Sequence, residues 1–310
     1  MFETITQYAS TNTPFLFYTN YKGTVAKVYT LDELEANGIE YSINAPIKKH
    51  SHINLNIQPI SLNDYKLKFN DYIDQIKYGN TYLGNLTQPT PIHCDLKLEE
   101  IYKIANATYK LHVKDQFVCF SPEPFISIEN NTIKTFPMKG TIDASTPNAK
   151  EIILKNKKEM AEHIMIVDLL RNDLSMVANN VKVNKFRYIQ KIKAGEKELL
   201  HVSSEISGQL KKNWRDSLGE IIKKLLPAGS ISGTPKINTV KILDEIEQYD
   251  RKFFSGIFGV YDGKKLETSV MIRFIEKKNE KLIYKSGGGI TLDSDVRLEY
   301  QEMLDKIYIP

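Results

Sequence analysis

The sequence contains only two cysteines, Cys94 and Cys119, among its 310 residues. Two thiols cannot build the disulfide framework of a small secreted protein, and their spacing matches no zinc-binding motif. We therefore expect two ordinary buried thiols in a protein that works in the reducing cytoplasm. Neither cysteine lies in a Gly-rich nucleophile turn, so the sequence does not predict a glutaminase site of its own.

Long apolar runs and dense basic blocks are also missing. No stretch of about 18 apolar residues could cross a bilayer, and the first ten residues include Glu3 but no apolar run, unlike a signal peptide. The net charge is only +4, and no Lys/Arg block is interleaved with aromatic residues. Membrane insertion and nucleic-acid binding are therefore not expected, whereas a mildly basic protein suits a small anionic ligand.

Linkers rich in Pro, Gly or Ser, internal repeats and low-complexity segments are absent as well. A chain of this length has room for one large or two medium domains, and the missing linker favours one continuous domain over residues 1–310. The expected helices and strands come in mixed runs without regular β-α alternation. This order predicts an α+β fold rather than a doubly wound parallel sheet.

Apolar periodicity places the elements. Ser61 can cap a helix that Gly79 ends, and Asp262–Gly263 is typical of a hairpin turn. Pro235 suits the first turn of a helix. Helices are expected over residues 61–78, 98–109, 147–177 with a break near Lys155, 216–226, 235–248 and 295–308. Strands are expected over residues 14–19, 23–30, 117–120, 125–129, 132–136, 181–192, 199–206, 254–261, 265–276 and 282–285.

Two of the expected helices each carry a pair of glutamates three residues apart. The pairs are Glu159 with Glu162 and Glu299 with Glu302, and residues at this spacing share one helix face. Two facing pairs would form an oxygen-rich site that suits Mg²⁺. Spacing alone leaves a second interpretation open, because most such pairs lie on a solvated helix surface. A di-iron bundle fits less well, since it requires Glu-x-x-His pairs.

Three further segments could carry chemistry. Residues 226–236 form a small-residue loop that enters a helix and could hold an anion, although the spacing is not that of a P-loop. Residues 287–289 are three glycines that permit close approach of a ligand, or form a flexible turn. Lys139 follows an expected strand. It is either a solvated charge or, if a ligand buries it, a nucleophile.

Taken together, these segments resemble the chorismate-utilising enzymes, a family that includes anthranilate, aminodeoxychorismate, isochorismate and salicylate synthases. The resemblance runs in collinear order from about Ile76 to the C-terminus. Its pieces are SPE at 121–123, PMKGT at 137–141, KEMAEHIMIVDLLRNDL at 158–174, HVSSEISG at 201–208, LPAGSISGTPK at 226–236, MIRF at 271–274, GGGITLDSD at 287–295 and EYQEMLDK at 299–306. One such piece would carry little weight, but eight in order make the resemblance specific.

The resemblance implies stacked antiparallel sheets with outer helices and an active site between them. Glu162 and Glu302 would then be Mg²⁺ ligands, while Glu159 and Glu299 would hold metal-bound water. The metal would bind the ring carboxylate of chorismate. Glu123 would be the general acid that protonates the leaving C4 hydroxyl.

The same resemblance assigns the substrate contacts. Arg273 would pair with the pyruvyl carboxylate, a role that suits a bidentate guanidinium. His201 and Thr141 would lie near the ring, and further carboxylate contacts are implied at three positions. These are Gly288, Gly289 and Lys306.

Lys139 decides the branch of the family. Aminodeoxychorismate synthases carry lysine there, whereas the other branches usually carry alanine. The implied reaction is amination of chorismate at C4, for 4-aminobenzoate and folate synthesis. Ammonia would come from a separate glutamine amidotransferase subunit. The stretch from Asp168 to Asp173 also resembles the two aminating branches more than the isochorismate branch.

Some positions depart from the family pattern. Phe254 stands where tyrosine is usual, so a phenolic hydrogen bond to the pyruvyl carboxylate would be missing. Leu83 stands where some relatives have a polar residue near the ring. The N-terminal region, about residues 1–60, is expected to be shortened, which makes tryptophan feedback inhibition unexpected. Three rival hypotheses are anthranilate synthase component I, a non-catalytic chorismate-binding or scaffold protein, and an unrelated Mg²⁺–phosphate enzyme.

Overall fold

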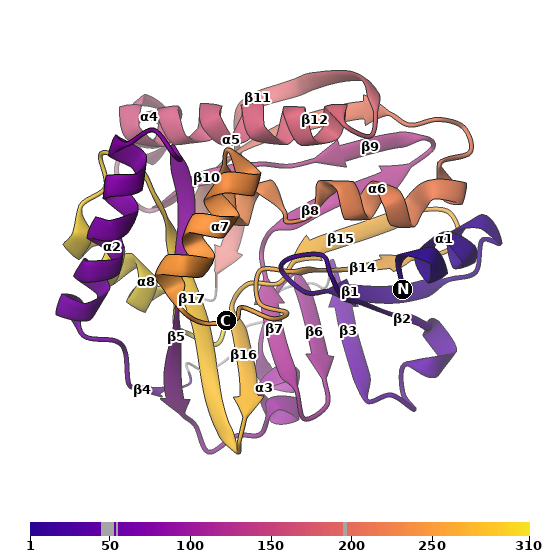
Figure 1. Cartoon of the computed structure of the whole chain (residues 1–310), viewed down its shortest axis with the longest axis horizontal. Coiled ribbons are helices and arrows are strands. Elements are labelled where there is room, and N and C mark those ends of the chain that lie inside the picture. The colour runs from indigo at the N-terminus through magenta and orange to yellow at the C-terminus, as the bar shows by residue number, and fades with distance from the viewer. Residues whose placement is uncertain (45–52, 54, 195–196) are drawn as a thin grey trace.

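The computed structural model describes residues 1–44, 53, 55–194 and 197–310. Within these ranges the strands form two antiparallel sheets, with helices packed on their outer faces (Figure 1). The α+β class predicted from the order of the elements is therefore confirmed. The expected short N-terminal region includes residues 45–52 and 54, which lie outside the described ranges.

The larger sheet has nine strands, in the order β10-β12-β9-β8-β15-β14-β1-β2 with β11 paired to β12. Its core packs against helices α1, α5 and α6, and Trp214 is buried among them. The bounds of its strands are β1 Phe15–Thr19, β2 Ala26–Thr30, β8 Pro124–Glu129, β9 Thr132–Thr135, β10 Met138–Asp143, β11 Asn179–Ala194, β12 Lys197–Gln209, β14 Ile257–Tyr261 and β15 Leu266–Val270.

The smaller sheet has eight strands, in the order β13-β5-β17-β16-β7-β6-β3 with β4 paired to β5. Helices α2, α7 and α8 pack together beside β5 and β17, as Figure 1 shows on the side where the strands carry the purple and yellow colours. The bounds of its strands are β3 Ile39–Ile43, β4 Asn56–Ile57, β5 Leu83–His93, β6 Tyr109–Val113, β7 Phe117–Ser121, β13 Gly233–Thr234, β16 Phe274–Lys278 and β17 Lys281–Ile290.

Side-chain caps mark the starts of α2 and α5. Ser61 accepts a hydrogen bond from the Asp64 amide and so caps α2, as predicted. The long helical region is broken at Asn156, which caps α5. The helices are α1 Phe2–Ser10, α2 Leu62–Lys77, α3 Leu98–Ile104, α4 Ala149–Lys155, α5 Lys157–Ser175, α6 Leu218–Leu225, α7 Lys236–Glu247 and α8 Val296–Asp305, with 3₁₀ turns at Leu31–Glu33, Trp214–Ser217 and Gly229–Ile231.

Three predicted elements were wrong in extent. The helix expected over 98–109 ends at Ile104, because Ala105 is extended and Tyr109 already begins β6. The strand expected over 265–276 is two strands, since the chain leaves the larger sheet after Val270 and enters the smaller one at Phe274. Pro235 caps α7 with extended backbone instead of lying in its first turn.

Two of the places where the chain crosses between the sheets lie next to each other. The chain passes from β7 to β8 through residues 122–123, and from β15 to β16 through residues 271–273. The crossings are joined, because the carbonyl of Glu123 accepts hydrogen bonds from the Val270 amide and from the Ser269 hydroxyl, the latter at 2.7 Å. Glu123 and Arg273 therefore both lie where one sheet gives way to the other.

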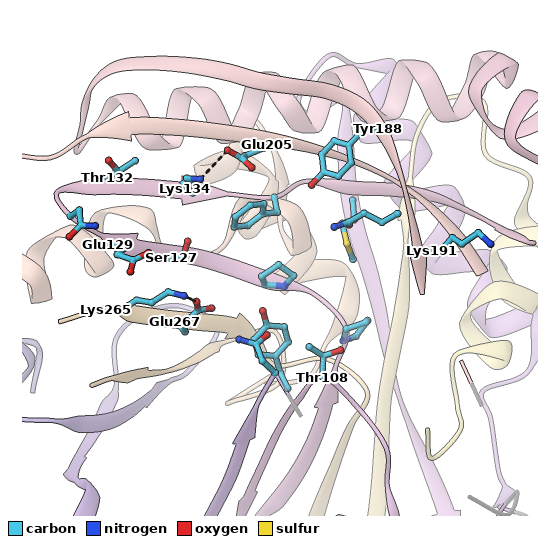
Figure 2. Close-up of a pocket in the computed structure, with 18 residues that line it drawn as sticks. Thr108, Ser127, Glu129, Thr132, Lys134, Tyr188, Lys191, Glu205, Lys265 and Glu267 are labelled. Atoms are coloured by element: carbon cyan, nitrogen blue, oxygen red, sulfur yellow. Dashed lines mark ion pairs between the residues drawn. The ribbon is translucent and has the colours of Figure 1, made fainter. Parts of the chain in front are cut away.

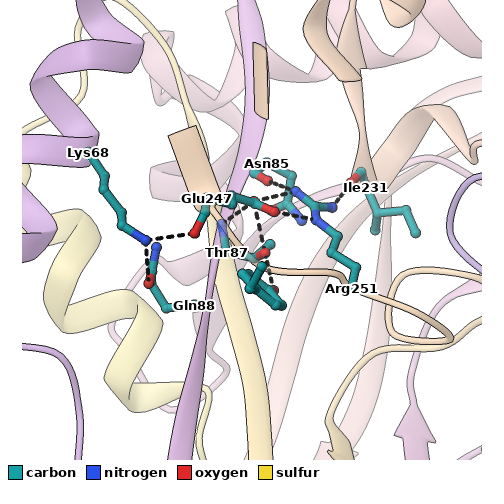
Figure 3. Close-up of polar contacts among 8 residues, drawn as sticks. Lys68, Asn85, Thr87, Gln88, Ile231, Glu247 and Arg251 are labelled. Atoms are coloured by element: carbon teal, nitrogen blue, oxygen red, sulfur yellow. Dashed lines mark hydrogen bonds and ion pairs between the residues drawn. The ribbon is translucent and has the colours of Figure 1, made fainter. Parts of the chain in front are cut away.

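A buried ion pair binds backbone groups on the side of β5 that faces away from β17 (Figure 3). Arg251 and Glu247 form two hydrogen bonds to each other, and both are nearly inaccessible to solvent. Arg251 also donates to the carbonyl of Asn85 at 2.6 Å, and Glu247 accepts from the amide of Thr87 at 2.8 Å. The two side chains thus make the hydrogen bonds that a neighbouring strand would make.

Candidate active site at the sheet crossing

Lys139 lies at a β-bulge. Met138 pairs with Ser203 and Thr141 with His201, so β10 contains one residue more than the facing segment of β12. Gly140 has φ +90°, a left-handed conformation that favours glycine. A bulge of this kind changes the direction of the neighbouring side chains. We attribute the placement of Lys139 to it.

The three glycines of β17 bring the predicted site residues close to its backbone. A Cβ atom at Gly289 would lie 3.3 Å from the Nζ of Lys139, and one at Gly288 would lie 3.3 Å from a carboxylate oxygen of Glu299. Glu302 lies 3.6 Å from the same point. A Cβ at either position would be in tight contact with these charged groups, so the glycines let Lys139 and the α8 carboxylates lie close to the strand without having to shift.

The α5 glutamates lie nearby. A Cβ atom at Gly140 would be 3.4 Å from a carboxylate oxygen of Glu159, and Glu162 is buried. The α8 pair has partners that the sequence did not reveal: Ser294 donates to Glu299 at 2.7 Å, and Lys306 pairs with Glu302 at 2.6 Å.

The chemistry of the four glutamates fits Mg²⁺, since carboxylate oxygens are its preferred protein ligands. In the ranges that the structure describes, however, no three His, Cys, Asp or Glu side chains are grouped closely enough to hold a metal ion together. The predicted Mg²⁺ site, formed by Glu159, Glu162, Glu299 and Glu302, therefore stays a prediction.

Three cations act on the pKa of Glu123. Burial raises the pKa of the Glu123 carboxyl, and a hydrogen bond from Ser230 together with the charges of Lys139, Arg273 and Lys306 opposes that rise. A carboxyl with a raised pKa stays protonated to higher pH, which suits a general acid. The three cations make the same region favourable for a ligand that carries two carboxylates.

Arg273 is held in an unusual backbone conformation, with φ +51°. Its guanidinium lies 5.3 Å from the centre of the Tyr308 ring. Its Nε is buried, and within the described part of the chain it has no hydrogen-bond partner. A buried donor without a partner is costly, so this nitrogen is suited to an anionic ligand.

The remaining predicted contacts lie around these groups. Lys306 donates to the carbonyl of Gly287 at 2.8 Å, and burial lowers the pKa of its ammonium group. Thr141 and His201 face each other with 3.4 Å between the hydroxyl and the ring nitrogens. Burial, together with the charge of Arg273, lowers the pKa of His201, so its ring is neutral near pH 7.

The two residues that depart from the family pattern are both apolar and buried. Leu83 is buried, and its methyl group would lie 3.5 Å from a Cβ at Gly289. Phe254 is buried against Phe274, with 6.0 Å between ring centres. Neither residue can supply a proton or a hydrogen bond. The sequence did not point to Ser230, Ser294 or Tyr65. The buried phenol of Tyr65 lies in the electrostatic field of Glu299 and Glu302.

A groove of about 1060 Å³ opens elsewhere, on the polar face of the larger sheet (Figure 2). Charged pairs line it, such as Lys134 with Glu205 at 3.2 Å and Lys265 with Glu267. It contains none of the predicted site residues, although Met138, next to Lys139, reaches into it. This large groove is not the candidate active site, because its lysines are already paired with carboxylates.

None of the helices in the described ranges combines the length and the apolar character that are required to cross a bilayer.

The relatives found by comparison with known protein sequences agree with one another. A Haemophilus influenzae protein named "Uncharacterized PabA-like protein" is 44% identical over 313 residues, which cover 99% of this chain and 95% of that protein. Aminodeoxychorismate synthase component 1 of Escherichia coli is 31% identical over 78% of this chain and 56% of its own length. The Bacillus subtilis protein of the same name is 32% identical over 77% and 54%. The chain thus matches about half of the length of these two synthases.

Solved structures agree with the fold. Anthranilate synthase component I from Streptococcus pneumoniae superimposes with a TM-score of 0.70 at 25% identity, covering 84% of this chain and 59% of that one. A putative isochorismate synthase from Bacillus anthracis, 18% identical, has a TM-score of 0.72 over 98% and 87% of the two chains. The model of the chorismate binding enzyme family matches residues 12–310, and the chain therefore belongs to that family.

Proposed function

We propose that this protein aminates chorismate at C4, with Mg²⁺ as cofactor, to form 4-amino-4-deoxychorismate. Ammonia would come from a glutamine amidotransferase subunit. The observation that carries the proposal is the position of Lys139, which the bulge in β10 brings beside Gly289 and Leu83. Relatives at 31–32% identity are named aminodeoxychorismate synthase component 1, which supports the same branch.

Substrate binding follows from the charges. Arg273 offers its buried Nε to the pyruvyl carboxylate, and Lys306 with the backbone of Gly288 and Gly289 receives the other end of the molecule. When bound between the glutamates of α5 and α8, Mg²⁺ would neutralise and orient the ring carboxylate. Leu83 excludes water from the side of the ring that faces Lys139.

The chemistry proceeds in two displacements. The amine of Lys139 attacks C2 of the ring while the C4–O bond breaks, and Glu123 donates the proton with which the hydroxyl leaves as water. Ammonia then attacks C4, the bond between C2 and the lysine nitrogen breaks to restore the free amine of Lys139, and the new C4 ammonium returns a proton to Glu123. His201 and Thr141 would lie beside the ring.

The test uses purified protein with chorismate, Mg²⁺ and ammonium, and the products are identified by mass. We expect aminodeoxychorismate, and we expect Lys139→Ala to lower its formation by roughly 1,000-fold or more, as loss of a nucleophile does. Lys134→Ala, at a lysine on the polar face of the same sheet, is the control. Without ammonium, a fraction of the wild-type protein should carry a ring adduct on the peptide that contains Lys139.

Two outcomes would redirect the proposal. If Lys139→Ala makes aminodeoxychorismate at the wild-type rate, the lysine is a bystander charge. If the wild-type protein makes anthranilate, the chain belongs with the anthranilate synthases, whose component 1 in Spirochaeta aurantia is 33% identical over 60% of this chain. Absence of turnover together with retained chorismate binding would indicate a non-catalytic binding protein.

A further inference from the structure

The stretch from Asp168 to Asp173 has no role in the mechanism above, yet its last residue is buried. The side chain of Asp173 is only 4% exposed and lies near the end of α5. One of its carboxylate oxygens pairs with the ammonium group of Lys236 at 2.7 Å. The other, Oδ2, is buried and has no hydrogen-bond partner within the described part of the chain. A buried carboxylate oxygen without a partner destabilises the fold, so its position requires another explanation.

Lys236 holds the paired oxygen from the first residue of α7. Its ammonium group also donates to the carbonyl of Leu225, the last residue of α6, at 3.2 Å. The lysine side chain is 13% exposed, so salt and water screen this ion pair little. Asp173 is thereby fixed between the end of α6 and the start of α7.

The unpaired oxygen of Asp173 lies against the turn Gly229–Ile231. A Cβ atom at Gly229 would lie 2.8 Å from this oxygen and 3.1 Å from a methyl carbon of Leu170. The first of these contacts is closer than a Cβ atom tolerates, so the turn or the aspartate would have to shift. Glycine therefore lets the turn rest directly on the Asp173 carboxylate.

The supported turn reaches the candidate general acid. Ser230, in the middle of the turn, forms a hydrogen bond with the Glu123 carboxylate. The far end of the turn is held as well, because the carbonyl of Ser232 accepts from the amide of Asn85 in β5 at 2.9 Å. Asp173 and β5 thus hold this turn at its two ends, and the hydroxyl that contacts Glu123 lies between them.

We propose that Asp173 is a positioning residue: held by Lys236, it supports the turn Gly229–Ile231 so that Ser230 stays aimed at Glu123. The inference rests on the proposed function for its part in the reaction, because Glu123 is the general acid there. It applies equally to the protein without substrate, because removal of the support should break the hydrogen bond between Ser230 and Glu123.

The direction of the change separates positioning from direct electrostatics. The hydrogen bond from Ser230 lowers the pKa of the Glu123 carboxyl, so its loss raises that pKa. Asp173→Asn also removes a negative charge and leaves Lys236 unpaired, and either charge effect alone would lower the pKa of Glu123 instead. The cations that act on Glu123 are unchanged in every variant: Lys139, Arg273 and Lys306.

The experiment titrates Glu123 by infrared difference spectroscopy, with Glu123→Gln to assign its protonated carboxyl band. In Asp173→Asn and in Gly229→Ala the carboxyl should titrate at higher pH than in the wild type, as in Ser230→Ala. Neither substitution should raise the titration further when Ser230→Ala is already present, because the effect passes through that hydroxyl. Asp168→Asn, whose side chain is 77% exposed on the same helix, is the control and should change nothing.

Turnover gives the second measurement. The descending limb of the kcat profile should move to higher pH in Asp173→Asn and Gly229→Ala. A misplaced acid should also lower kcat roughly tenfold, part of the about 10²- to 10⁴-fold that general acid catalysis supplies. KM for chorismate should stay unchanged, because neither residue contacts the substrate.

A carboxyl that titrates at the wild-type pH or below it in both variants would overturn the proposal. A lower urea midpoint with an unchanged titration would do the same, because Asp173 would then only stabilise the fold. If Asp173→Asn does not fold, Gly229→Ala decides, since it leaves both charges in place. Failure of the proposed function is distinguishable: the wild type would then form no aminodeoxychorismate, whereas the infrared titration of Glu123 would still respond to Asp173.

Discussion

At the scale of single residues, the placement of the lysine and the glutamates at the candidate site depends on the glycines beside them. Gly289 leaves room for Lys139, and Gly288 leaves room for Glu299 and Glu302. The motifs name each of these residues and the structure brings them close to β17, while their roles in the site stay predictions. The sequence did not predict the bulge that directs Lys139, because the pairing of β10 with β12 depends on residues about 60 positions apart.

The α8 carboxylates lead to the first prediction. Glu302→Gln should abolish Mg²⁺-dependent turnover, because a neutral amide is a poor ligand for a hard cation. Glu299→Gln should raise the Mg²⁺ concentration needed for half-maximal rate by about 10- to 100-fold, the usual cost of removing an outer-shell partner. Asp305→Asn, at an exposed position of the same helix, is the control. Full activity of Glu302→Gln, or of the wild type in excess chelator, would remove the metal assignment.

Glu123 leads to a prediction about pH. Its raised pKa keeps the acid protonated, so the rate should fall as pH increases through that raised value. The hydrogen bond from Ser230 lowers the pKa of Glu123. Ser230→Ala should therefore move the descending limb of the kcat profile to higher pH, whereas Ser230→Thr should keep it in place. A limb that does not move, or one that persists in Glu123→Gln, would assign the proton to another group.

At the scale of elements, β5 is a strand that the sequence did not predict. Pro89 and Pro91 argue against a strand, yet both lie within β5. The amides of Asn85 and Thr87 point away from β17, to Ser232 and Glu247. Because alternate residues share a direction, the prolines stand on that same open side, where no ladder hydrogen bond is needed. Propensity cannot anticipate this, since the edge is completed by distant side chains.

The edge of β5 can be tested through the buried ion pair. Glu247→Gln should lower the free energy of unfolding by about 3–5 kcal/mol, because it leaves the Arg251 charge buried and unpaired. The control is an exposed pair that ends on the same helix: Lys22, between β1 and β2, pairs with Asp244 of α7 at 2.7 Å, and the two side chains are 46% and 38% exposed. Lys22→Ala should cost at most about 1 kcal/mol. Urea titrations followed by circular dichroism measure both, and equal costs would contradict the role given to Glu247.

At the scale of the whole molecule, one apolar cluster joins the two sheets. It contains Leu16 and Phe258 from the larger sheet with Leu111 and Phe274 from the smaller one. Helix α1, which the sequence left unassigned, closes the far end of the larger sheet against α6, where the backbone of Phe2 lies against Gly219. The candidate site lies where the chain crosses between the sheets, so its geometry depends on their staying together.

The expected single domain over residues 1–310 can therefore be tested by cooperativity. Trp214 is the only tryptophan and is buried in the core of the larger sheet, so its fluorescence reports on that sheet. If the joining cluster couples the sheets, fluorescence and far-ultraviolet circular dichroism should give the same urea midpoint. Phe258→Ala should lower the free energy of unfolding by about 3–5 kcal/mol and shift both midpoints together. Two separate midpoints in the wild type would mean that the sheets unfold as independent units. The crossing at Glu123 and Arg273 would then be a hinge instead of a fixed frame.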